Sequence, residues 1–353
     1  MFRALSIDGG GMRGLYTAAY LAELEAAHST RRKVDGLDVG AAFQLIVGTS
    51  TGAIIGCGLA IGTPPQTMME LYRLHGAEVF PKKLTERIQD IIPQLITRAA
   101  HLARGETALQ RQLEGLFGTT TLLEVWANRR IALAVPAVNM STYRSWVFKT
   151  PHDPSTDHRD DGRTLVQVCL ASSAAPLFRS LAVLNHSQSD TYDVFADGGL
   201  WANNPVLVTL AEALRFVGNS DEEIEIFSLG TCGKPEGEII ARDARHRGLL
   251  QWKFGGGAAA VSIAAQEYSF DAIARFLQPH LKNKVRFVRF PAEKIPGALL
   301  QYLDLDETRP EGLNALIQQA RQDAHMTNSY NYRGTEDGLA IAALFNAMPP
   351  RAE

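Results

Sequence analysis

The chain has 353 residues, of which 46% are hydrophobic and 21% are charged, and its net charge is −3 at pH 7. This composition is typical of a globular protein with a sizeable core, and the charge balance excludes a general binder of DNA or RNA. No charge-free apolar run reaches the roughly 18–20 residues that span a bilayer, and no secretory signal is visible. The three cysteines lie far apart. We therefore expect core thiols in a cytoplasmic protein, without a disulfide framework or zinc site.

The apolar pattern predicts strands that alternate with helices. The expected strands are 4–8, 43–47, 131–138, 146–149, 192–196, 224–229 and 285–290, and the expected helices are 15–28, 50–61, 66–75 and 205–217. Such alternation favours an α/β fold in which helices cover both faces of a mostly parallel sheet. Neither a repeat nor a long linker divides the chain, so residues 1–353 are expected to form one domain.

A glycine cluster at residues 8–14 follows the first expected strand and opens a helix. Gly9, Gly11 and Gly14 match the dinucleotide-binding pattern G-x-G-x-x-G. That fold needs an acidic residue at the end of the second strand, where this chain has a glycine, a threonine and a serine. The dinucleotide interpretation therefore fails at its confirming residue.

The same cluster suits an oxyanion hole formed by Gly9, Gly10 and Gly11. Successive glycines let backbone N–H groups point into a cavity, where they stabilise negative charge that develops during a reaction. Gly10 and Gly11 are the expected donors. Arg13 either holds this loop, adds positive charge near the oxyanion, or is a solvated arginine at a helix start.

Ser50 follows a buried strand and stands between Gly48 and Gly52. A strand that runs into Gly-x-Ser-x-Gly and then into a helix is typical of a nucleophile elbow, although small-residue turns also contain such strings. The glycines give the backbone room for a sharp turn, and the helix N-terminus favours negative charge near the serine oxygen.

Asp197 ends another apolar strand and precedes Gly198 and Gly199. In isolation this is a common Asp-Gly turn. None of the nine histidines stands in a comparable glycine-rich setting at a strand end. A Ser–Asp dyad therefore explains the pattern with fewer assumptions than a triad, with Asp197 as the base that accepts the proton of Ser50.

With these residues in order, the chain resembles the patatin-like phospholipases. The matching motifs are Asp8–Gly14, Gly48–Gly52 and Asp197–Gly199, supported by 171–176, 203–205 and 228–231. The resemblance covers residues 1–232 and extends more loosely to about 325. It implies a three-layer α/β/α fold and a lipid acyl hydrolase that needs neither metal nor cofactor. It also implies Ser50 as nucleophile, Asp197 as base and the Gly9–Gly11 loop as oxyanion hole.

Among bacterial patatin-like proteins of this length, the chain is similar to the phospholipase effectors of anti-phage systems. That similarity implies a membrane phospholipid substrate, a cyclic dinucleotide activator and peripheral action on the membrane. A homodimer is left open. The alternatives are an unregulated housekeeping lipase of the same fold and a non-catalytic binding module.

Two regions lie outside these motifs. Segment 82–105 has apolar residues at helical spacing and more basic than acidic residues, with an interruption expected near Pro93. As a cap-like insertion, it either contacts an anionic bilayer, forms a lid, or packs on the core. Residues from about 248 form a C-terminal extension. Within this extension, segments 252–257 and 286–289 either bind a ligand, form a subunit interface, or take part in ordinary packing of helices and strands.

Overall fold

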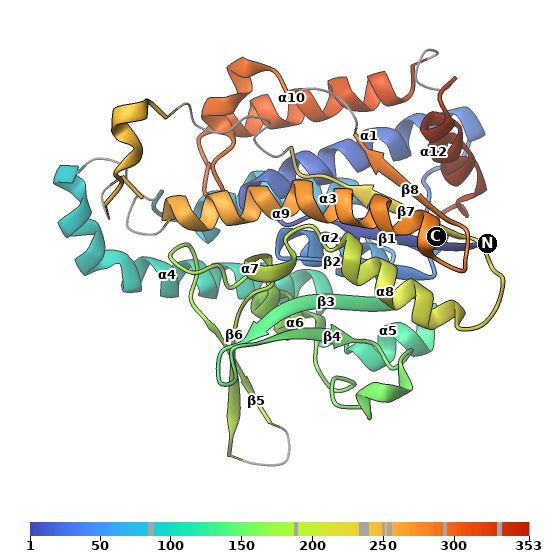
Figure 1. Cartoon of the computed structure of the whole chain (residues 1–353), viewed down its shortest axis with the longest axis horizontal. Helices are drawn as coiled ribbons and strands as arrows, with labels where there is room; N and C mark the ends of the chain where they lie inside the picture. Colours follow the sequence, from blue (N-terminus) through green and yellow to red (C-terminus); the bar gives the residue numbers. More distant parts are fainter. Residues whose placement is uncertain are drawn as a thin grey trace.

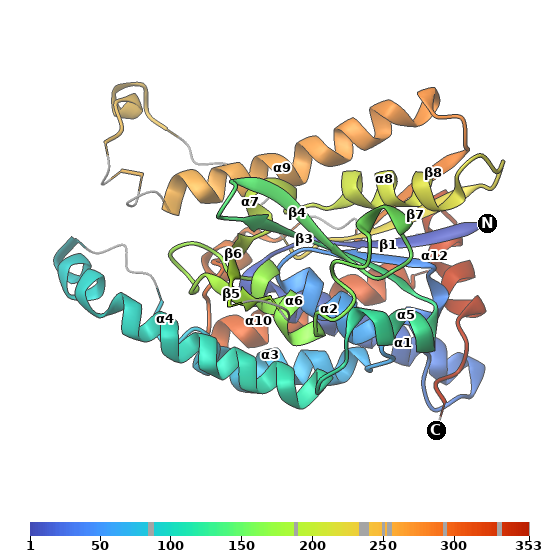
Figure 2. The same ribbon diagram turned by 90° about the horizontal axis from the view of Figure 1, so that it is seen from below.

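The computed structural model describes residues 1–83, 88–186, 190–232, 240–248, 251–252, 256–291, 295–329 and 334–352, with the backbone alone for 88–96 and 259. A central sheet runs through the molecule with helices on both of its faces (Figures 1 and 2). The expected α/β fold with a mostly parallel sheet is confirmed.

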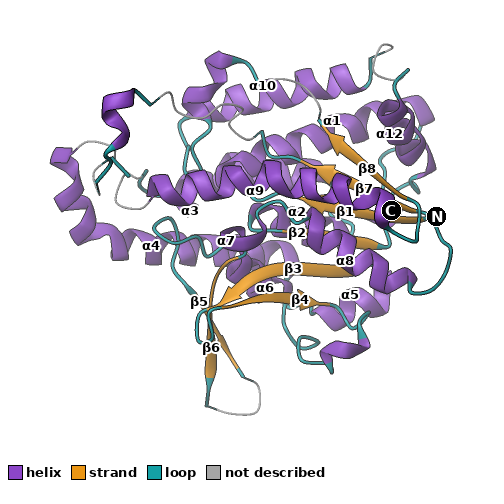
Figure 3. Ribbon diagram, in the orientation of Figure 1, coloured by secondary structure: helices purple, strands orange, loops and turns teal. Residues whose placement is uncertain are grey.

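Strands and helices are interspersed along the chain (Figure 3). The strands are β1 (Phe2–Ile7), β2 (Leu45–Gly48), β3 (Ala132–Asn139), β4 (Arg144–Lys149), β5 (Ala182–Asn185), β6 (Tyr192–Asp197), β7 (Ile224–Leu229) and β8 (Val285–Phe290). Strand β3 leads directly into β4, and β5 leads directly into β6. Their order is β5-β6-β3-β2-β1-β7-β8, and β4 also pairs with β3. The pairs from β3 through β2, β1 and β7 to β8 are parallel, whereas β4, β5 and β6 pair antiparallel.

Helices cover the two faces of this sheet unequally. The main helices are α1 (Gly14–Arg32), α2 (Thr51–Ala60), α3 (Pro65–Val79), α4 (Ile88–Phe117), α5 (Leu122–Arg129), α6 (Leu165–Ser172), α7 (Gly199–Ala202), α8 (Val206–Val217), α9 (Gly256–Leu277), α10 (Pro310–Thr327) and α12 (Glu336–Ala347). The larger core lies between the sheet and the face of α1, α2 and α10. The smaller core joins the other face to α8 and part of α9.

Alternation along the strands separates these two cores. Leu5 and Ile46 belong to the larger core, and their neighbours Ala4 and Leu45 belong to the smaller one. Successive side chains of a strand point to opposite faces, so strands buried on both faces are apolar throughout. Within the described ranges, no helix combines the length and apolar character that a bilayer crossing requires.

The segment expected to be interrupted near Pro93 differs from that prediction. Helix α4 runs without a break from Ile88 through Pro93 to Phe117. A proline removes one backbone hydrogen bond, and here the long helix continues beyond it. The described residues do not include 84–87 or the side chains of 88–96. The basic amphipathic surface expected in segment 82–105 therefore stays a prediction. In the C-terminal extension, residues 253–255 also lie outside the described residues.

Candidate active site

The pairing of β3 explains how two distant residues meet. Along one edge β3 pairs with β4 from Ala134 to Asn139, so its other partners must share the opposite edge. On that edge β2 is in register up to Ala134, and β6 is in register from Asn139 back to Ala137. Strands β2 and β6 run in opposite directions, and their carboxyl ends therefore approach each other end to end. Ser50 follows β2, and Asp197 ends β6.

Ser50 stands at a sharp turn between β2 and α2. Its φ is 56° and its ψ is −118°, a positive-φ backbone conformation that residues other than glycine rarely adopt. Its amide N–H donates to Ser172 Oγ at 2.9 Å, and the Ser172 hydroxyl donates to the Pro136 carbonyl at 2.7 Å. These bonds fix the serine at the N-terminus of α2, as expected for a nucleophile elbow.

The glycines on either side of this turn permit close backbone contacts. A Cβ on Gly48 would lie 2.1 Å from the Gly52 carbonyl oxygen, and a Cβ on Gly52 would lie 2.3 Å from the Ile7 oxygen. Any side chain here would overlap main-chain atoms that cannot move aside without displacing β1 or α2. The backbone geometry therefore requires glycine at both positions.

Asp197 is buried and accepts a hydrogen bond from the hydroxyl group of Ser50. Ser50 Oγ donates to Asp197 Oδ2 at 2.8 Å, and the N–H of Gly199 donates to Asp197 Oδ1 at 2.6 Å. Burial raises the pKa of Asp197 to about 6, against the lowering effects of Gly199, Ser50 and the nearby Arg179. The carboxyl group is therefore mainly ionised at neutral pH and is a stronger base than an exposed aspartate.

Gly198 completes the turn after this aspartate. Its N–H donates to the Ser172 carbonyl at 3.1 Å, and a Cβ there would lie 2.2 Å from the Pro136 oxygen. Within the described chain, none of the histidines forms a hydrogen bond or ion pair with Ser50 or Asp197. The contact between Ser50 and Asp197 is the one that the expected dyad requires.

The first glycine cluster lies against the serine. A Cβ on Gly9 would be 3.4 Å from Ser50 Cβ, yet the Gly9 N–H already donates to the Asn203 carbonyl at 2.8 Å. By contrast, the N–H groups of Gly10 and Gly11 donate no hydrogen bond within the described part of the chain. Gly9 therefore shapes the loop, while Gly10 and Gly11 retain the free donors that an oxyanion hole needs.

Arg13 is buried and holds the Gly9–Gly11 loop through hydrogen bonds, so it is not a solvated arginine. The residue is 4% exposed, and its guanidinium donates to the carbonyls of Gly10 at 3.3 Å and Cys232 at 3.4 Å. It also lies 3.5 Å from Glu267 of α9. These bonds fix the position of the Gly10 peptide. Of the roles open to Arg13 from the sequence, the structure agrees with holding the loop.

Sequence reasoning missed several residues that support the site. Asn203 Nδ2 donates to the Gly9 carbonyl at 3.4 Å and to Glu267 Oε1 at 2.9 Å, and Thr231 Oγ1 donates to the same carbonyl at 2.9 Å. Asn203 and Thr231 stand within runs already matched to the family. Only their role was absent from the prediction, and Glu267 had no sequence signal because its contact depends on how α9 folds back.

Asp8, which follows β1, forms an ion pair with Arg289 of the edge strand β8. Asp8 is 1% exposed and forms an ion pair with the Arg289 guanidinium, which also lies 3.0 Å from Asp271 of α9. Burial raises the pKa of Asp8 to about 7, and the positive charge of Arg289 opposes that rise. Within the 286–289 stretch, Arg289 is therefore committed to internal contacts rather than to an exposed ligand surface.

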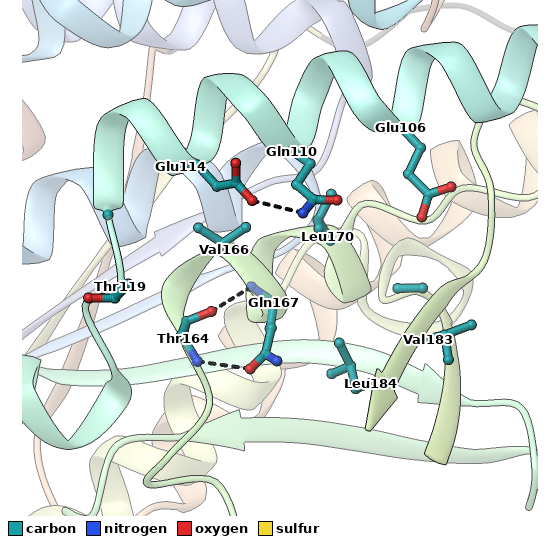
Figure 4. A pocket seen from close by; sticks show the side chains of 12 residues that line it. Glu106, Gln110, Glu114, Thr119, Thr164, Val166, Gln167, Leu170, Val183 and Leu184 are labelled. Carbon is teal, nitrogen blue, oxygen red and sulfur yellow. Dashed lines mark hydrogen bonds between the residues drawn. The ribbon is translucent and has the colours of Figure 1, made fainter. Parts of the chain in front are cut away.

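A separate groove of about 570 Å³ lies between α4, α6 and β5 (Figure 4). Its described lining residues include Glu106 and Glu114 but no lysine or arginine. The other end of α6 carries Ser172, which contacts the Ser50 turn. The groove thus lies on elements that support the site, but its acidic lining does not suit an anionic ligand.

The chain is similar in sequence to a group of known proteins. A family model described as patatin-like phospholipase matches residues 5–210. Over 333 residues the chain is 31% identical to a cGAMP-activated phospholipase of Vibrio cholerae, covering 91% of this chain and 89% of that protein. It is 35% identical over 278 residues to a cGAMP-activated phospholipase of Pseudomonas aeruginosa, covering 78% and 74%. It is 28% identical over 239 residues to a cUMP-AMP-activated phospholipase of Escherichia coli, covering 66% of each.

Proposed function

The chain belongs to the patatin-like phospholipase family, and on that premise we propose that it hydrolyses acyl esters of membrane phospholipids through Ser50 and Asp197. The observation that carries this proposal is the 2.8 Å hydrogen bond from Ser50 Oγ to Asp197 Oδ2, beside a glycine loop with free N–H groups. We further propose that the protein acts peripherally, at the surface of the membrane that contains its substrate.

In the proposed reaction, Asp197 accepts the hydroxyl proton as Ser50 Oγ attacks the ester carbonyl. The negative charge moves to the carbonyl oxygen, where the N–H groups of Gly10 and Gly11 stabilise it. The C–O bond to the lysolipid then breaks, and the proton held by Asp197 passes to the leaving oxygen. Water then attacks the acyl-enzyme as Asp197 accepts one of its protons. The bond from the acyl carbon to Ser50 Oγ breaks, Asp197 returns the proton to Ser50, and the fatty acid is released.

Release of fatty acid from phospholipid vesicles tests this mechanism. Ser50→Ala should lower kcat by at least about 10³-fold because the nucleophile is lost, and Asp197→Ala should have nearly the same effect. Ser141→Ala is the matched control, since Ser141 is exposed and lies in the β3–β4 turn away from the site. Full activity of either dyad variant, with wild-type unfolding behaviour, would exclude the assignment.

We also propose that a cyclic dinucleotide switches this activity on. The support is the similarity to relatives named cGAMP-activated and cUMP-AMP-activated phospholipases. In a bacterial cell, such a switch would let the enzyme degrade the membrane as an effector of anti-phage defence. The groove of Figure 4 is a poor candidate for the activator site, because Glu106 and Glu114 would repel the two phosphates.

Fatty-acid release measured with a panel of cyclic dinucleotides tests the switch. We expect one member, such as cGAMP or cUMP-AMP, to raise the rate strongly, while the Ser50→Ala variant stays inactive with every nucleotide. Equal rates with all nucleotides and with none would leave an unregulated lipase. That result would remove the switch and leave the proposed hydrolysis intact.

A further inference from the structure

Helix α9 (Gly256–Leu277) exposes apolar side chains on its outer face, while its inner face combines polar side chains with the core residues Phe270 and Ala274. Gln266 and Glu267 bond Asn203, and Asp271 bonds Asn204 and Arg289, so these polar side chains point toward the protein. The opposite face is apolar and exposed. Its members are Ala258, Val261, Ala265, Tyr268, Ala272 and Phe276, here named the α9 stripe. A surface helix normally presents its charged side chains to water.

The exposure of the large members of the stripe is high. Val261 is 59% exposed, Tyr268 is 82% exposed and Phe276 is 74% exposed. Helix α9 packs on α7 and α8 and lies outermost on its side of the sheet (Figure 2). The described part of the chain therefore leaves this stripe uncovered.

The spacing of the stripe indicates what covers it. Ala258, Val261, Ala265, Tyr268 and Ala272 follow one another at intervals of three and four residues. This is the a and d pattern of a helix that packs along another helix. Alanine occupies each a position, and a larger side chain occupies each d position.

This alternation of sizes is self-complementary. In an antiparallel pair of α9 helices related by a two-fold axis between Gln266 and Glu267, each a position faces a d position of the other copy. Ala265 then faces Tyr268 of the second copy, and Ala272 faces its Val261. Ala258 faces the partner's Arg275 and Phe276. Every small side chain is thus opposite a larger one, which is the condition for close packing across an isologous interface.

The area available is sufficient for a specific dimer. A large aromatic side chain offers roughly 150–250 Å², so Tyr268 and Phe276 supply on the order of 300 Å² per copy. With Val261 and the alanines, the stripe supplies on the order of 500 Å² per copy, or about 1,000 Å² in total, which reaches the lower range of specific interfaces.

A bilayer fits the same face less well. Helices that lie on membranes carry lysine or arginine along their polar side. In α9 the charged residues are Glu267, Asp271 and Arg275, and the two acids are turned inward. We therefore propose that the α9 stripe is a dimer interface, and that its occupant is the α9 stripe of a second copy of this chain in antiparallel orientation.

Sedimentation over a concentration series tests this proposal on the full chain. The wild type should be dimeric, and Tyr268→Glu should raise the dimer dissociation constant roughly 100-fold, because two buried carboxylates would replace two aromatic contacts. Tyr143→Glu is the matched control, since Tyr143 is also 82% exposed but lies in the β3–β4 turn. It should leave the dimer unchanged.

A charge exchange tests the orientation. Ala265→Lys alone should be monomeric, as should Tyr268→Glu. A mixture of the two should dimerise again, because the antiparallel register places the new lysine opposite the new glutamate. A monomeric wild type, a dimeric Tyr268→Glu variant or a mixture that stays monomeric would each overturn the proposal. Loss of vesicle binding by Tyr268→Glu with a monomeric wild type would assign the face to lipid instead.

Discussion

Glu267 of α9 accepts a hydrogen bond from Asn203 Nδ2 at 2.9 Å, although the two residues are 64 positions apart in the chain. Asn203 also accepts the N–H of Gly9 at 2.8 Å through its backbone carbonyl. Glu267 lies beyond residues 5–210, which the family model matches. The C-terminal part of the chain therefore contributes directly to the position of the glycine loop beside Ser50.

Replacing Glu267 should test that contribution. Glu267→Ala removes the acceptor for Asn203 and the negative charge near Arg13, so we expect kcat to fall roughly tenfold with little change in KM. Glu267→Gln keeps an acceptor oxygen and should restore most of kcat. Steady-state kinetics on phospholipid vesicles provide the measurement. A wild-type kcat for Glu267→Ala would show that Asn203 and Arg13 hold the loop without α9.

The pKa of Asp197 predicts how the rate depends on pH. Because burial raises this pKa to about 6, the carboxylate becomes protonated and loses its function as base when the pH falls through about 6. The value of kcat/KM should therefore be high at neutral pH and fall tenfold per pH unit on the acid side. A profile that stays flat to about pH 4 would contradict Asp197 as the base.

Arg179 offers an independent control of that profile. It is 7% exposed, and its positive charge lowers the pKa of Asp197. Arg179→Met removes the charge while keeping much of the apolar stem, so the pKa of Asp197 should rise and the acid limb should move to higher pH. Arg179→Lys should keep the limb near its wild-type position. An unchanged limb in Arg179→Met would contradict an effect of the Arg179 charge on the pKa of Asp197.

The sequence predicts the strands of this fold well because local patterns determine them. The expected strands 224–229 and 285–290 coincide with β7 and β8. Four-residue β5 was not predicted, because such a short edge strand carries little periodicity. Helix α9 was also missed, since apolar residues lie on both its inner and its outer face and the usual amphipathic signal is therefore lacking.

In the candidate site, too, the residues that follow from local patterns were predicted, and the long-range contacts were not. The sequence alone singles out Ser50 and Asp197, because strand ends next to glycines are a local pattern. The sequence alone does not predict the hydrogen bond from the Gly9 N–H to the Asn203 carbonyl or the ion pair between Arg13 and Glu267. Those contacts depend on the pairing of β3 with both β2 and β6 and on the return of α9, which are long-range properties of the chain.

The elbow glycines give a final prediction, on stability. A Cβ at Gly48 would lie 2.1 Å from the Gly52 oxygen, within the turn that carries Ser50. Because both groups are backbone, a rotamer change cannot relieve the overlap, and Gly48→Ala should destabilise the fold by about 1–3 kcal/mol. Gly115→Ala is the matched control: Gly115 is an exposed residue of α4 with nothing within 4 Å of its added Cβ.

The control should change stability in the opposite direction. Alanine in a helix interior is favoured over glycine, so Gly115→Ala should stabilise the fold by about 0.5–1 kcal/mol. Urea unfolding of both variants, with the slopes compared to the wild type, measures these changes. Even where Gly48→Ala remains folded, a shifted Ser50 would no longer align with Asp197, so its esterase activity should fall more than its stability alone explains. Equal midpoints and activities for both variants would show that the turn can relax and that Gly48 is not required by the elbow.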